Sequence, residues 1–145
     1  MSLRILEDRR KFEFHMLEPG ERAQLIDLLR ETLRTRGDVL AATVYGGFVK
    51  NQLFRDIDVA VFTGYTVPYA RVEEYEDELS ESLSRLVGIP VDVRVVDYAP
   101  PQFRVRALGG VVLIERVPAL AARLRFKSQQ EIGDIKAKIH RAVRA

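Results

Sequence analysis

Two aspartates that lie two residues apart are the part of the sequence best suited to bind a metal ion. Asp56 and Asp58 stand at the beginning of the apolar run Ile57–Phe62. Side chains at positions i and i+2 of a strand project from the same face, so the two carboxylates would lie close together. Like charges that close repel each other, and a cation between them relieves the repulsion. Because carboxylate oxygens are typical magnesium ligands, the pair predicts a Mg²⁺ site at the start of a strand.

A glycine pair precedes these aspartates and is suited to bind phosphate. The apolar run 39–45 ends at Gly46 and Gly47, where a backbone without Cβ atoms can approach a phosphate and direct N–H groups at it. Lys50 can meet the negative charge, and Asn51 is expected to add a turn residue with positive φ. Taken singly these features have simpler explanations, since glycine pairs are common in turns and aspartate pairs are usually solvated or ion-paired.

A third carboxylate, Asp92, lies in a later strand. Val91, Val93 and Val95 alternate with Asp92 and Arg94, which is the period of a half-buried strand. The simplest interpretation of this segment by itself is that Asp92 is an exposed strand residue paired with Arg94 or another base.

Helices and strands alternate around these residues. Leucines at helical spacing predict an N-terminal helix at about residues 20–36, and residues 39–45 and 57–62 predict buried strands. A long amphipathic helix should run from Pro68 to the stop at Gly88. Its inward residues are expected to be Val72, Tyr75, Leu79, Leu83 and Leu86. A short helix at 102–108 and a strand at 111–114 follow, so the pattern predicts an α/β domain with helices over a sheet.

The C-terminal tail is predicted to be helical from Pro118 onward. Ser128 and Glu131 have the spacing of a capping box, which indicates either a break into two helices or a kink at that point. The second part is expected to bury the apolar residues of its helical repeat, Ile132, Ile135, Ile139 and Val143.

Composition excludes several classes of protein. The chain has 145 residues, no cysteine and a formal net charge of +2, so disulfides and thiolate chemistry are excluded and a cytoplasmic location is expected. No apolar run approaches the roughly 20 residues of a membrane helix, and neither histidine is given a role.

The charges are unevenly distributed: six acids lie between Glu73 and Glu81, whereas residues 117–145 carry seven basic residues against two acids. Both segments are either solvated helix faces or docking surfaces.

In this order, the motifs resemble the signature of the polymerase-beta-like nucleotidyltransferases. The resemblance runs from about residue 39 to 115 and consists of the strand ending in Gly46-Gly47, the Asp56-x-Asp58 pair and the later carboxylate Asp92. It implies a mixed sheet of about four strands with a helical C-terminal tail, in one domain with a core at about 38–116 and a tail at 118–144. It further implies that Asp56 and Asp58 hold two Mg²⁺ ions on a triphosphate, with ATP as the expected substrate, and that Asp92 joins them at the ion that activates the acceptor hydroxyl. Gly46, Gly47 and Lys50 would bind the nucleotide.

Two departures from the family pattern bear on activity. Serine is more usual at the position of Gly47, and the loop 48–55 is shorter than is typical. A missing hydrogen bond to a charged group costs roughly 1.5 to 3 kcal/mol, which is about tenfold or more in nucleotide binding. The alternative is therefore a binding module that kept the fold and neutralises a partner by contact. A purely structural α/β domain is the third interpretation.

Minimal members of this kind resemble the antitoxin of HEPN/MNT toxin–antitoxin pairs. That resemblance implies a helical HEPN-type partner whose tyrosine hydroxyl accepts AMP. The basic tail or the acidic helix face would be the docking surface. Membrane and nucleic-acid partners are not expected, and a homo-oligomer is left open.

Overall fold

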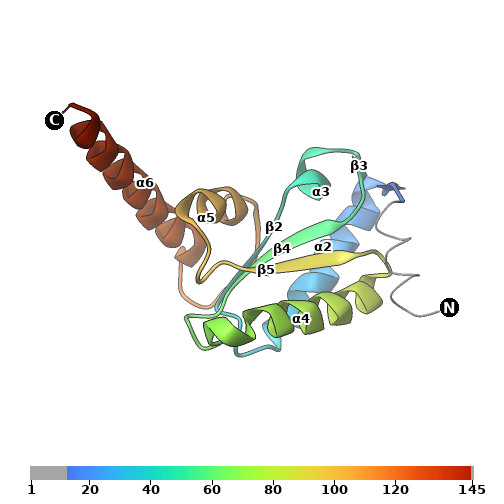
Figure 1. The fold of residues 1–145 in the computed structure, drawn as a ribbon. Helices are drawn as coiled ribbons and strands as arrows, with labels where there is room; N and C mark the ends of the chain where they lie inside the picture. Colours follow the sequence, from blue (N-terminus) through green and yellow to red (C-terminus); the bar gives the residue numbers. More distant parts are fainter. Residues whose placement is uncertain (1–12, 145) are drawn as a thin grey trace.

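A four-stranded sheet lies at the centre of the computed structural model, which describes residues 13–144 (Figure 1). The strand order is β5-β4-β2-β6, with β2 at Ala41–Tyr45, β4 at Ile57–Phe62, β5 at Val91–Val95 and β6 at Val111–Glu115. β2 is antiparallel to β4 and β6, whereas β4 and β5 are parallel and are joined by a crossover helix. The predicted four-stranded mixed sheet is therefore confirmed. A further pair of two-residue strands, β1 (His15–Met16) and β3 (Leu53–Phe54), was not predicted.

Helices cover both faces of the sheet. α2 (Pro19–Arg34) and α4 (Val72–Val87) pack on one face, and α5 (Pro101–Leu108) and the start of α6 (Leu120–Arg144) pack on the other. A four-residue helix, α3 (Gly47–Lys50), follows β2, and a 3₁₀ turn, η1 (Tyr69–Arg71), precedes α4.

Alternation along the strands divides the apolar residues between two cores. In β2, Ala42 and Val44 face α2 and α4, while Ala41 and Tyr45 face α5. The buried Thr43 hydroxyl donates a hydrogen bond of 2.7 Å to the Ala107 carbonyl, which attaches α5 to the sheet. The end of β2 is therefore packed between α2 and α4 on one face of the sheet and α5 on the other.

Local signals explain where the two long helices over the first core begin and end. α2 begins with a capping box of Glu18 and Glu21, and α4 ends at Gly88, whose φ of 75° suits glycine. Leu79 and Leu83 are buried as predicted. The predicted inward position of Leu86 was wrong, because its side chain is exposed. It lines a groove between α4 and α2 and does not reach the core.

α6 is one continuous helix. Of the two alternatives predicted at Ser128, a break or a kink, the break into two helices was therefore wrong. Ser128 does not cap a new helix, because its buried hydroxyl donates to the Leu124 carbonyl one turn earlier. The expected burial of the following apolar residues is also wrong: Ile135, Ile139 and Val143 are exposed, since α6 extends past α5 (Figure 1). Among residues 13–144, no helix combines the length and the apolar character that crossing a membrane requires.

Candidate active site

The strand register brings the predicted acidic residues to one end of the sheet. Tyr45 at the end of β2 is paired with Asp58 in β4, and Asp58 is paired with Asp92 in β5. Asp56 lies two residues before Asp58, just outside the strand. Paired residues project from the same face, so these side chains share the face that α5 covers in part. Residues far apart in the sequence thus form one acidic group.

The carboxylates influence one another electrostatically. Burial, followed by the charges of Asp56 and Asp92, raises the pKa of Asp58 from 3.8 to about 6. A bound cation would remove this penalty, and the hard carboxylate oxygens suit Mg²⁺. As they are placed, the described residues do not form a ready cluster of three metal-binding side chains, so binding requires the carboxylates to turn toward the ion.

Asp92 also has an ion-pair partner within its own strand. Arg94 Nε lies 3.5 Å from Asp92 Oδ2, with the two side chains 56% and 43% exposed. The simpler interpretation of Asp92, a strand residue paired with Arg94, thus describes a contact that exists. Exposed pairs of this kind contribute only about 0 to 1 kcal/mol, so a metal ion could replace the arginine at little cost.

The glycine turn lies directly beside Asp58. Gly46 has a φ of 77°, and a Cβ atom added there would lie 2.6 Å from Asp58 Oδ2, so only glycine fits. Gly47 begins α3, and the first N–H groups of a helix have no partner within it. Lys50 ends α3 and is exposed. Asn51 is extended, with a φ of −123°, so its predicted left-handed conformation was wrong.

Arg22 of α2 holds the glycine loop in place. Its guanidinium donates to the carbonyls of Phe48, Asn51 and Gln52, the last two at 2.9 and 2.7 Å. It also lies over the rings of Phe48 and Phe54, 4.9 and 5.1 Å from their centroids. Sequence reasoning missed this role, because Arg22 is one of several arginines on an amphipathic helix and the loop carbonyls that it contacts lie at least 26 residues away.

An aromatic and basic wall borders the carboxylates on the α5 side. The rings of Tyr45 and Phe103 are edge to face at 5.8 Å, and the Arg106 guanidinium lies 5.3 Å from the Phe103 centroid. Burial, followed by the charges of Asp58 and Asp92, raises the pKa of the Tyr45 hydroxyl, so it stays protonated. The charges of Arg94 and Arg106 offset part of the rise in the pKa of Asp58. Sequence reasoning missed this wall, since it depends on where α5 lies over the sheet.

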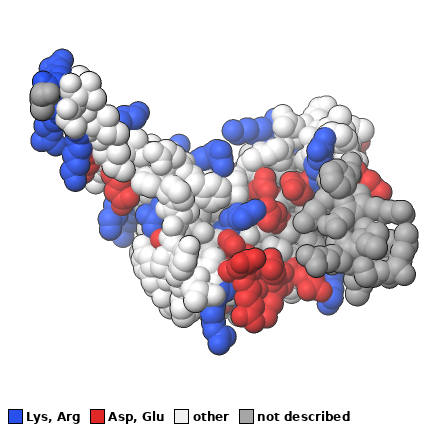
Figure 2. Space-filling view, in the orientation of Figure 1, with Lys and Arg blue, Asp and Glu red and all other residues white. Residues whose placement is uncertain are grey.

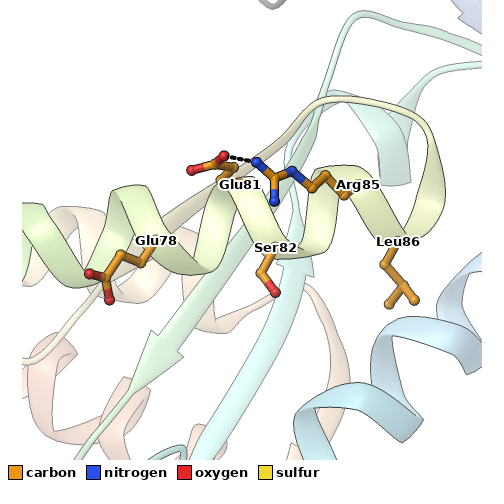
Figure 3. Close-up of a pocket in the computed structure, with 5 residues that line it drawn as sticks. All are labelled: Glu78, Glu81, Ser82, Arg85 and Leu86. Atoms are coloured by element: carbon orange, nitrogen blue, oxygen red, sulfur yellow. Dashed lines mark hydrogen bonds and ion pairs between the residues drawn. The ribbon is translucent and has the colours of Figure 1, made fainter. Parts of the chain in front are cut away.

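Acidic and basic side chains lie on different parts of the molecular surface. Acidic side chains gather over α4 and the adjoining end of the sheet, and basic side chains occupy the far part of α6 (Figure 2). A groove on α4 lies away from the predicted residues and is lined by Glu78, Glu81, Ser82, Arg85 and Leu86 (Figure 3). Arg85 and Glu81 pair across one helical turn there, so the groove has the character of a solvated helix face.

The chain is similar to known proteins both in its sequence profile and in its fold. Residues 27–119 match the sequence profile of the family described as polymerase beta, nucleotidyltransferase, which is more than half of the chain. Among curated protein sequences, none matches this chain.

Solved toxin–antitoxin structures have a similar fold. One is a tri-AMPylated Shewanella oneidensis HEPN toxin in complex with MNT antitoxin (17% identity, TM-score 0.57, covering 89% of this chain and 100% of that one). Another is a toxin–antitoxin with AMP-PNP (18%, 0.61, 86% and 98%). A third is the MntA–HepT pair (17%, 0.58, 88% and 100%). At these identities the likeness establishes the fold.

Proposed function

Because this chain belongs to the polymerase beta nucleotidyltransferase family, we propose that it transfers AMP from ATP to a tyrosine hydroxyl of a HEPN-type partner protein. The observation that carries the proposal is the register that places Asp58 beside Asp92, with Asp56 and the Gly46-Gly47 turn next to them. The solved relatives add support for the acceptor, since one of them contains an AMPylated HEPN toxin.

The residues divide the reaction between them. Asp56 and Asp58 would hold magnesium on the triphosphate, and Asp92 would face the acceptor. Bound Mg²⁺ supplies charge neutralisation on the phosphates and makes the acceptor hydroxyl easier to deprotonate. The tyrosine oxygen attacks the α-phosphorus, the bond from that phosphorus to the bridging oxygen breaks, and pyrophosphate leaves. Asp92, which pairs with Arg94 in this structure, would accept the hydroxyl proton once Arg94 has moved aside.

The remaining residues would contribute to catalysis by positioning the nucleotide. The Gly46-Gly47 backbone would cradle the β- and γ-phosphates, and Lys50 would add a positive charge. The rings of Tyr45 and Phe103, which are in edge-to-face contact, would limit water access on the α5 side of the carboxylates. No histidine is needed in this scheme.

A second candidate function is a binding module that holds the partner without efficient turnover. Gly47 favours it, because no hydroxyl is available at that position to hold the terminal phosphate. In this case the chain would bind Mg–ATP weakly and neutralise its partner by contact alone.

Two asparagine variants test the proposal. Mg–ATP at 100 times its dissociation constant should stabilise the parent by about 2.7 kcal/mol, which is about 5 to 10 °C in melting temperature. Asp58→Asn should lose this shift and also lose transfer of α-labelled AMP to a HEPN protein. Asp92→Asn should bind Mg–ATP within a few-fold of the parent but transfer label about 100-fold more slowly, since its contact is made mainly in the transition state.

Asp77→Asn is the matched control, because it removes one exposed carboxylate of α4 outside the site. It should behave as the parent in both assays. If ATP without magnesium stabilises the parent as much as Mg–ATP does, the metal site is wrong. If Mg–ATP binds but no variant or parent transfers label, the binding module is the correct function.

A further inference from the structure

The outer half of α6 has no neighbour within the described chain. Ala121 and Ser128, near the start of the helix, are buried against the body of the protein, whereas residues 133–144 are all exposed. Figure 1 shows this half as an arm that projects beyond α5. The reason is one of length, since α5 has only eight residues and cannot cover a helix of 25.

The arm carries an apolar face that continues the packed face of the same helix. Residues 121, 124, 128, 132, 135, 139 and 143 follow one another at spacings of three and four, so they lie along one side of α6. The first three lie in the packed half of α6. Ile135, Ile139 and Val143 are 44%, 59% and 79% exposed, and with Ile132 they extend over roughly 17 Å at 1.5 Å per residue. We refer to these four residues as the arm face.

Basic side chains surround the arm face. Between residues 132 and 144 the sequence has Lys136, Lys138, Arg141 and Arg144 but only one acid, Asp134. Figure 2 shows blue side chains among white ones along the distal arm. Lys136 and Lys138 flank the apolar residues on opposite sides of the helix at 100° per residue. A second copy packed on the same face would bring these like charges together, which is unfavourable.

We propose that the arm face binds an amphipathic helix of a partner protein whose apolar stripe is bordered by Asp and Glu residues. Aliphatic side chains of this spacing pack into the grooves of a facing helix, and the acidic border would pair with the lysines. The inference rests on the proposed function for the existence of a protein partner, and it adds the surface and the chemistry through which that partner is held.

A pair of synthetic helical peptides tests the chemistry directly. Both carry a leucine stripe at i, i+3, i+4 and i+7 and are stapled to hold the helix; one is bordered by glutamate and the other by lysine. The full-length protein should bind the glutamate peptide at least tenfold more tightly in fluorescence anisotropy, and less tightly at high salt. Equal binding of the two peptides, or no binding of either, overturns the proposal.

Variants of α6 locate the binding. The double variant Ile135→Ser and Ile139→Ser should weaken binding of the glutamate peptide at least tenfold. Phe126→Ser is the matched control, because Phe126 is 62% exposed on the same helix but lies two residues before Ser128, on the opposite side. It should leave the affinity unchanged. Equal losses in the two proteins would place the peptide elsewhere and overturn the proposal.

Two other occupants give different results. If the parent self-associates in sedimentation and the double variant is monomeric, a second copy covers the face and the proposal fails. It also fails if the parent, but not the double variant, binds vesicles of phosphatidylcholine and phosphatidylserine. The double variant should keep the Mg–ATP melting shift of the parent. A parent without that shift contradicts the proposed transfer but leaves the peptide result standing.

Discussion

Replacing Arg22 with alanine is expected to weaken nucleotide binding although Arg22 does not belong to the acidic group. Its guanidinium connects α2 to the carbonyls of three residues in the segment 48–52, which follows the glycine turn. Without the guanidinium, the segment 48–52 would stay connected to the strands on either side. It would lose the hydrogen bonds that hold α3 in a single conformation. Arg22 is therefore a positioning residue for the proposed triphosphate site.

The structure limits how large this effect can be. A hydrogen bond to a charged group contributes about 1.5 to 3 kcal/mol, but the carbonyls of Asn51 and Gln52 are bonded at the surface and can be hydrated once Arg22 is gone. The two ring contacts add about 0.5 to 1 kcal/mol each at an exposed site. We expect a net loss of about 2 to 3 kcal/mol, which lowers the melting temperature by about 5 to 10 °C. If half of this lost free energy is the cost of ordering the loop again when the nucleotide binds, the affinity for Mg–ATP drops about tenfold.

Two measurements and one control separate positioning from general stability. Titration calorimetry should show the tenfold loss of Mg–ATP affinity, and amide hydrogen exchange should speed up at Val49 and Asn51, whose N–H groups bond within this turn. Arg30→Ala is the control, because Arg30 also lies in α2 and donates to the carbonyls of Leu113 and Val112, but far from the loop. It should lower stability without changing affinity. Equal changes of affinity in Arg22→Ala and Arg30→Ala, or no change in either, would refute the reasoning.

Three further outcomes are expected. Gly47→Ser should tighten Mg–ATP binding in calorimetry, because a Cβ atom there would meet Asn51 Nδ2 at an ordinary 3.7 Å; weaker binding would show that Gly47 is needed as glycine. Gly46→Ala should lower both the melting temperature and the affinity, since its positive φ and its contact with Asp58 exclude a side chain; an unchanged protein would contradict the description of the turn. In chelator, the stability contributed by Asp58 should be full below about pH 4 and be lost as pH rises through its folded pKa of about 6. Asp58→Asn should therefore flatten the fall of melting temperature between pH 4 and 6, and parallel curves for the two proteins would refute the shift.

Much of the fold was predictable because its signals are local. Alternating and helical spacing of apolar residues depends only on the geometry of strands and helices, so residues 57–62, 91–95 and the helix ending at Gly88 were placed correctly. The spacing of Asp56 and Asp58 likewise fixes their common face before any tertiary contact forms. Asp92 could be associated with them only through the resemblance, because its pairing with Asp58 is a contact across strands.

The remaining features depend on which element lies opposite another. Ile135 and Ile139 have the spacing of core residues, yet they are exposed because α5 ends before it reaches them. Arg22 looks like any solvated arginine in the sequence, and only the packing of α2 against the glycine loop makes it a positioning residue. Short-range spacing was enough to predict the four strands of the main sheet, most of the helices and the residue types of the acidic site. Tertiary structure decided which side chains meet and which apolar face is left uncovered, because both depend on the lengths and positions of elements distant in the chain.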